Sequence, residues 1–147
     1  MTVSFYDTVD DALLKFAVIV AKHNGKWVFC KHKERDTYEV PGGHREKDEA
    51  IIETAKRELY EETGAIDYTI IPLCVYSVIG KNRVNDNGDE TYGMLYYADI
   101  KAFDELPPSE MEIRVCLESL PEKWTYPLIQ PQLISKTETL IFGNISS

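Results

Sequence analysis

The feature that most constrains the fold is an amphipathic segment behind a glycine pair, VPGGHREKDEAIIETAKRELYEETGA at residues 40–65. At about 100° per residue, a helix here gathers one apolar stripe, formed by Ile51, Ile52, Ala55 and Leu59. We predict that the helix begins with Asp48 as its N-cap and ends at Gly64. Because a helix with one apolar face must be covered, this segment requires at least one further layer of structure.

The same helix carries a cluster of carboxylates. Glu58, Glu61 and Glu62 are neighbours at i, i+3 and i+4, where like charges repel one another and resist desolvation. A divalent cation among them would reverse that cost, whereas a solvated acidic face remains the alternative for the cluster alone. The preceding pair Gly42 and Gly43 tolerates positive φ and lets backbone carbonyls approach a ligand. Oxygen ligands of this kind suit Mg²⁺ or Mn²⁺.

These residues match a known pattern, G-x5-E-x7-R-E-U-x-E-E-x-G-U, in which U is a bulky apolar residue. The matching positions are Gly43, Glu49, Arg57, Glu58, Leu59, Glu61, Glu62, Gly64 and Ala65. Every fixed position agrees, and Ala65 is merely smaller than the usual apolar residue. The segment therefore resembles the Nudix hydrolases, enzymes that cleave a diphosphate linked to another moiety.

The resemblance implies roles for individual residues. The Gly43 carbonyl, Glu58, Glu61 and Glu62 would hold Mg²⁺ or Mn²⁺, and Glu58 and Glu61 would take part in activating water. Arg57 would orient Glu58 or Glu49 rather than touch the substrate. The segment from Gly43 to Ala65 that matches the pattern is called the box below. In some family members a glutamate outside the box accepts the proton of the attacking water. Glu112, and with less support Glu110, lies in the matching loop, although simple solvation explains these two residues equally well.

Apolar, β-branched runs predict strands around the helix. They lie at Leu13–Ala21, Lys26–Lys33 (a hairpin through Asn24-Gly25), Ile66–Ile79, Thr91–Ile100 and Ile113–Leu120. A second helix is expected at Trp124–Ile134, with Pro127 in its first turn. The first eleven residues are expected to be extended or frayed, and residues 136–147 to form a short strand and a loose end. This order predicts the α/β class, an α/β/α sandwich whose mixed sheet is flanked by helices, in one domain spanning residues 1–147.

The substrate is less constrained. Lys31, Lys33 and Arg35 approach the glycine pair along one strand and could meet phosphates, or could simply be solvated. Residues 79–83 lack the proline and the tyrosine that mark the ADP-ribose and dinucleoside polyphosphate subfamilies. By exclusion, and because the box looks MutT-like, a nucleoside triphosphate such as 8-oxo-dGTP is the leading candidate. Thr125 stands where some MutT-type members read the base with asparagine, which predicts a broader range of triphosphates.

Three alternatives stay open. They are hydrolysis of ADP-ribose or another nucleotide sugar, removal of pyrophosphate from RNA 5′ ends, and nucleotide sensing without catalysis. The net charge of −9 argues against a nucleic-acid partner, and the complete set of box carboxylates argues against a sensor.

Composition adds limits. No run approaches the roughly 20 apolar residues of a membrane span, and the N-terminus lacks a signal-peptide pattern, so no membrane partner and a cytoplasmic location are expected. Cys30, Cys74 and Cys116 are widely spaced within apolar runs and are expected to be buried thiols. The resemblance is also compatible with a homodimer.

Overall fold

The computed structural model describes residues 1–80, 88–105 and 112–143. Its centre is a seven-stranded sheet with strand order β1-β5-β6-β2-β3-β7, in which β4 also pairs with β2. The strands are β1 (Thr2–Tyr6), β2 (Leu14–His23), β3 (Lys26–His32), β4 (Gly42–His44), β5 (Ala65–Ile79), β6 (Thr91–Phe103) and β7 (Glu112–Leu117). The helices are a 3-10 turn (Asp11–Leu13), α1 (Ile51–Thr63) and α2 (Gln130–Ile141). The pair β2 and β6 is parallel and the other pairs are antiparallel, so the sheet is mixed as predicted.

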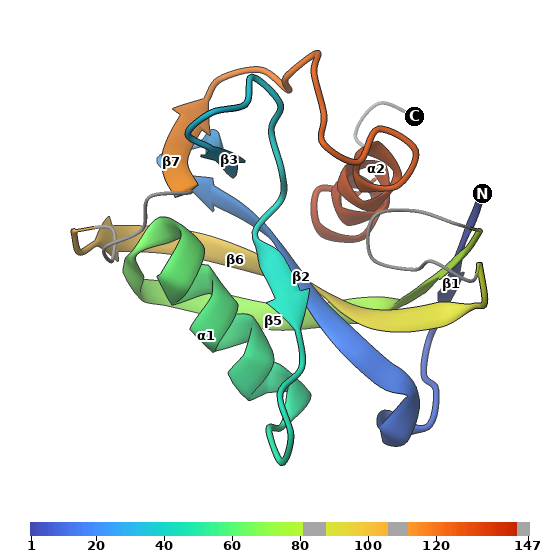
Figure 1. Cartoon of the computed structure of the whole chain (residues 1–147). Coiled ribbons are helices and arrows are strands. Elements are labelled where there is room, and N and C mark those ends of the chain that lie inside the picture. Colours follow the sequence, from blue (N-terminus) through green and yellow to red (C-terminus); the bar gives the residue numbers. More distant parts are fainter. Residues whose placement is uncertain (81–87, 106–111, 144–147) are drawn as a thin grey trace.

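The two helices lie on opposite sides of the sheet (Figure 1). Alternation along β2 explains how one strand serves both: Ala17 and Ile19 belong to the core cluster under α1, and Val18 and Val20 to the cluster under α2. Both faces are therefore apolar, and the predicted sandwich architecture is confirmed. Among the described residues, neither helix reaches the length and apolar character needed to cross a membrane.

Helix α1 begins later than the sequence predicted. Asp48 is not the N-cap, because it has φ +62° and lies in the turn before the helix. Ala50 takes that place, and its N–H donates to Glu53 Oε1 at 2.9 Å. The predicted end is confirmed: Gly64 adopts φ +78°, and its N–H donates to the Tyr60 carbonyl at 2.8 Å.

The glycine pair forms a strand rather than a positive-φ turn. Gly42 and Gly43 belong to β4, opposite Val18 and Ala17 of β2, and neither has positive φ. Space explains the glycines instead. A Cβ on Gly42 would lie 2.5 Å from the Ala17 carbonyl oxygen, and one on Gly43 would collide with the Glu58 carboxylate.

The C-terminal prediction was wrong in its limits. Helix α2 starts at Gln130, with Pro131 in its first turn, and continues through Lys136 to Ile141, where a short strand was expected. A proline lacks an N–H and is tolerated only where no helical hydrogen bond is needed, so Pro131 fixes the start of the helix. Residues 144–147 lie outside the described part.

Two smaller expectations can now be compared with the structure. The N-terminal arm is extended, the first of its two predicted alternatives, and it is not frayed, because β1 pairs with β5 over the register Thr2↔Ile79 to Tyr6↔Val75. Cys30 and Cys74 are buried as expected, whereas Cys116 is exposed on β7 at the end of the sheet order. The predicted hairpin of β2 and β3 through Asn24 and Gly25 is confirmed.

Candidate functional site

Two glutamates of α1 reach the glycine pair of β4. Glu62 Oε1 accepts a hydrogen bond from the Gly42 N–H at 2.7 Å, and its Oε2 lies 3.7 Å from the Cys30 thiol, which donates to it. Glu58 packs its carboxylate directly over Gly43. These two carboxylates therefore lie between α1 and the two glycines of β4, which have no side chains to displace them.

Arg57 ties the remaining carboxylates together. Its Nε and Nη2 donate to Glu49 at 2.7 and 3.1 Å, and its Nη1 donates to Glu58 at 2.6 Å and to Glu61 at 3.0 Å. Nη2 also donates to the His44 carbonyl oxygen at 2.9 Å. One guanidinium thus joins α1, the loop before it and β4, and the orienting role that the resemblance implies for it stays a prediction.

Two of the three glutamates hydrogen-bonded to Arg57 have pKa values shifted in opposite directions. The hydrogen bond from Arg57, helped by the Glu46 N–H and the Thr54 hydroxyl, lowers the pKa of Glu49 to about 2. Burial raises the pKa of the Glu58 carboxyl above its ordinary value, although Arg57 opposes the shift. Glu58 is therefore a carboxylate whose desolvation Arg57 only partly compensates, and an additional cation would stabilise its charge.

The donor set fits a divalent metal in its chemistry. Three carboxylates and backbone oxygens beside a glycine pair are ligands that Mg²⁺ and Mn²⁺ prefer. In the described residues, no three His, Cys, Asp or Glu side chains already form a closed metal-binding group. Glu58 and Glu61 are bonded to Arg57, and Glu62 to Gly42, so these contacts would have to rearrange around an ion.

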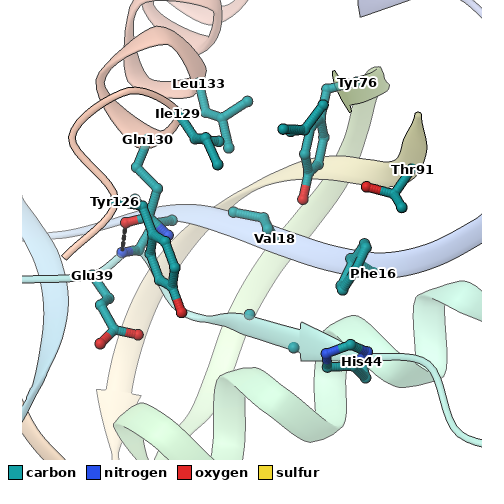
Figure 2. Close-up of a pocket in the computed structure, with 14 residues that line it drawn as sticks. Phe16, Val18, Glu39, His44, Tyr76, Thr91, Tyr126, Ile129, Gln130 and Leu133 are labelled. Carbon is teal, nitrogen blue, oxygen red and sulfur yellow. Dashed lines mark hydrogen bonds between the residues drawn. The ribbon is translucent and has the colours of Figure 1, made fainter. Parts of the chain in front are cut away.

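A cavity of about 230 Å³ opens on the α2 side of the glycine pair (Figure 2). Its apolar wall consists of Phe16, Val18, Val40, Tyr76, Val78, Ile129 and Leu133. Its polar side chains are Glu39, His44, Thr91, Tyr126 and Gln130. Gly42 and Gly43 line it as well, so the same dipeptide borders both the cavity and the carboxylates. Aromatic rings around an apolar hollow are suited to a planar ligand.

Four predicted substrate residues lie outside the lining of this cavity. Lys31 donates from Nζ to the Arg35 carbonyl oxygen at 2.6 Å, while the side chains of Lys33 and Arg35 are exposed. Thr125 is buried, and its hydroxyl lies 2.8 Å from the Thr37 hydroxyl. The neighbouring Tyr126 faces the cavity instead. The substrate contacts predicted for these four residues remain predictions.

The candidate bases outside the box are only partly placed. Glu112 begins β7 opposite His32 of β3, but its side chain lies outside the described part of the structure. The whole of Glu110 is outside the described residues, and so are residues 81–87 of the loop expected between β5 and β6. Their proposed roles are unchanged.

Sequence reasoning missed Glu39 and Gln130. Glu39 stands three residues before Gly42 and forms an isolated bridge with Cys30, and nothing in the local sequence predicts which way its side chain faces. Gln130 is 90 residues from its hydrogen-bond partner Val40, and no local pattern predicts that contact. The only signal was indirect, since a polar residue at the start of an apolar helix is a candidate for a specific buried contact.

The comparisons with known proteins agree with this geometry. The model of the NUDIX domain matches residues 13–133. The chain is similar to the Bacillus subtilis (strain 168) protein named "Putative 8-oxo-dGTP diphosphatase YtkD", with 35% identity over 91 residues. That match covers 62% of this chain but only 53% of YtkD.

Solved structures share the fold. The Bacillus subtilis pyrophosphohydrolase BsRppH, in a crystal structure of a point mutant, gives a TM-score of 0.74 at 28% identity, covering 93% of this chain and 89% of that one. The NUDIX domain of Shewanella oneidensis NrtR, complexed with ADP ribose, gives 0.64 at 16% identity, covering 88% of each chain. The family match over most of the chain, on top of the carboxylate arrangement, shows that this chain belongs to the Nudix family.

Proposed function

We propose that this Nudix domain hydrolyses a nucleoside triphosphate to the monophosphate and pyrophosphate, with an oxidised purine nucleotide such as 8-oxo-dGTP as the leading substrate. One observation carries the proposal: Gly42 and Gly43 border the aromatic cavity on one side and Glu58 and Glu62 on the other. A base held in the cavity would place its phosphates over the glycine pair, beside the carboxylates. The similarity to YtkD supports the same substrate class.

The chain's own residues supply charge and position. Water must attack a phosphoanhydride that carries several negative charges, so these charges must be neutralised and the water must lose a proton. A divalent cation, when bound, neutralises phosphate charge and acidifies water. Glu58, Glu61, Glu62 and the Gly43 carbonyl are the groups that would hold it. Arg57 binds both Glu58 and Glu61 and would hold their carboxylates in position, and a box glutamate or Glu112 accepts the proton.

The second candidate is pyrophosphate release from the 5′ end of a triphosphorylated RNA. BsRppH is a pyrophosphohydrolase and matches this chain along most of its length, which supports the release of pyrophosphate. The net charge of −9 disfavours an RNA substrate, because binding a polymer of phosphates requires basic side chains along its path.

A hydrolysis screen tests the proposal. The protein is incubated with dGTP, 8-oxo-dGTP, ADP-ribose and triphosphorylated RNA in Mg²⁺, in Mn²⁺ and in EDTA, and phosphate and pyrophosphate are scored separately. We expect pyrophosphate from the triphosphates, fastest from 8-oxo-dGTP, and no turnover in EDTA. Preferential cleavage of ADP-ribose or of RNA would overturn the substrate assignment.

A matched pair of variants tests the carboxylates. Glu61→Gln removes one charge from the cluster, and Glu138→Gln removes one from an exposed position on α2. We expect kcat to fall by about 100-fold or more in the first variant, the scale on which a positioned acid–base group acts, and to be unchanged in the second. Full activity of Glu61→Gln at saturating Mg²⁺ would refute this assignment of the metal site.

A further inference from the structure

Gln130 presents a fixed pair of hydrogen-bond donors to the cavity. Gln130 is 7% exposed as a residue, and its Oε1 accepts from the Val40 N–H at 2.8 Å. Because a backbone N–H can only donate, this bond identifies the oxygen end of the amide and leaves Nε2 as the other end. Within the described residues, Nε2 has no acceptor, and Gln130 lines the cavity.

Glu39 lines the same cavity and offers hydrogen-bond acceptors instead of donors. Its backbone is held against Cys30 by two hydrogen bonds, N to O at 2.8 Å and O to N at 3.0 Å. Its carboxylate makes no hydrogen bond or ion pair with the described residues. Figure 2 shows Glu39, Tyr126 and Gln130 toward one end of the cavity, and Phe16, His44 and Thr91 toward the other. An ionised carboxylate can only accept hydrogen bonds.

We propose that Gln130 and Glu39 together select guanine-type bases, with Gln130 Nε2 donating to O6 and the Glu39 carboxylate accepting from N1–H and N2–H. The inference rests on the proposed function only in placing a base in this cavity. A guanine edge has one acceptor beside two donors, which an amide donor and a carboxylate lining the same end of the cavity can complement. Guanine and 8-oxoguanine share this edge, so the pair reads the base class and not its oxidation.

The same two groups reject adenine. Its 6-amino group would meet the Gln130 donors, and its unprotonated N1 would meet the Glu39 carboxylate. Buried polar groups left without partners strongly disfavour a ligand that cannot pair with them. Good bidentate base contacts discriminate by roughly 10- to 100-fold, and we expect a guanine preference of that order. Hypoxanthine keeps O6 and N1–H but lacks the 2-amino group, so it should fall between guanine and adenine.

Binding of nucleoside monophosphates tests this without any turnover. Titration calorimetry of the wild-type protein should give affinities in the order GMP, IMP, AMP. Gln130→Glu keeps an acceptor for the Val40 N–H but turns the donor end into an acceptor. We expect this variant to bind GMP at least about tenfold more weakly than the wild type does. Its loss of affinity for AMP should be smaller than its loss for GMP. Glu39→Gln should lose about tenfold for GMP and little for AMP.

Two controls match the charge changes. Gln132→Glu makes the same change on an exposed residue of α2, and Glu34→Gln makes it on an exposed residue after β3. Both should bind the three ligands as the wild type does. Equal wild-type affinity for GMP and AMP, or no measurable binding of either, would overturn the inference. So would an undiminished GMP preference in Glu39→Gln.

The two proposals fail separately. Selective binding of GMP without hydrolysis of any triphosphate would support the base reader and refute the hydrolytic function. Hydrolysis of all triphosphates at similar rates, with equal binding of GMP and AMP, would support the function and refute the reader.

Discussion

Arg57 grips Glu49 through two parallel hydrogen bonds, from Nε to Oε2 at 2.7 Å and from Nη2 to Oε1 at 3.1 Å. Glu49 is itself held, since its Oε1 accepts from the Thr54 hydroxyl at 2.7 Å and from the Glu46 N–H at 3.0 Å. The guanidinium is therefore fixed in orientation, and so is its Nη1, which donates to Glu58 and Glu61. A planar fork fixed on one side is a precise way to orient carboxylates on the other.

Replacing Arg57 by Gln should lower activity through position and not through substrate contact. The change removes the donors to Glu49, Glu58 and Glu61 and leaves three carboxylates without their shared counter-charge. Loss of a group that orients metal ligands typically costs about 10- to 100-fold. We expect a fall of that size in kcat/KM, together with a higher Mg²⁺ concentration for half-maximal activity.

Lys56→Gln is the matched control for Arg57→Gln. It removes the same charge from an exposed position on the same helix and should leave both quantities unchanged. If Arg57→Gln lowered thermal stability but left the Mg²⁺ dependence as in the wild type, Arg57 would stabilise the fold without orienting the metal-binding carboxylates.

The Glu49–Arg57 pair also predicts an acid-dependent loss of stability. The pKa of Glu49 is lowered from its ordinary value of 4.5 to about 2, so its contribution is complete above about pH 4.5 and disappears as the pH falls toward 2. The Tm difference between the wild type and Glu49→Gln should be largest above pH 5 and should shrink as the pH falls from about 4.5 toward 2. Thermal unfolding from pH 7 to pH 2.5 measures it, with Glu138→Gln as a flat reference. A gap that stayed constant across the window would contradict the pairing.

The carboxylate cluster could be predicted from sequence because it is local. Glu58, Glu61 and Glu62 share one face of one helix, and the spacing of a helix is the same wherever the helix packs. The glycine pair was also identified, but for another reason than the structure gives. Conformational freedom was expected, whereas the structure needs room for the Glu58 carboxylate and for the backbone of β2.

The parts that could not be predicted depend on distant partners. Pro127 and Pro131 both suit a first helical turn, and only the structure shows that α2 starts at the second. Cys116 lies within an apolar run, but such a run does not tell which strand lies at the end of the sheet. Gln130 meets Val40, the residue after Glu39, across 90 residues of sequence, so the pairing of Glu39 and Gln130 in the cavity has no local signature.

The two glycines of β4 should respond differently to alanine. At Gly43 the new Cβ meets the end of the flexible Glu58 side chain, which can move, so the fold should survive while the carboxylate is displaced. At Gly42 it meets the Ala17 carbonyl oxygen at 2.5 Å and the Val18 Cα at 3.0 Å, both of them backbone atoms.

We therefore expect Gly43→Ala to lose at least about tenfold in kcat/KM with nearly wild-type stability. Gly42→Ala should lose about 1–3 kcal/mol of unfolding free energy, the usual cost of overpacking. Urea unfolding and steady-state kinetics on both variants separate the effects. Equal losses of activity and stability in the two proteins would show that Glu58 does not occupy the space over Gly43.

Thr125 offers the sharpest comparison between the expectation from sequence and the geometry. Its hydroxyl is buried and lies 2.8 Å from that of Thr37, joining the segment before α2 to the segment before β4. Thr125→Val keeps the shape and removes this bond, so we expect a loss of about 0.5–1.5 kcal/mol in unfolding free energy. Thr37→Val should cost a similar amount, and the double variant no more than either, because both remove one shared interaction. A KM for 8-oxo-dGTP that rises in Thr125→Val but not in Thr37→Val would instead favour the direct substrate contact predicted from sequence.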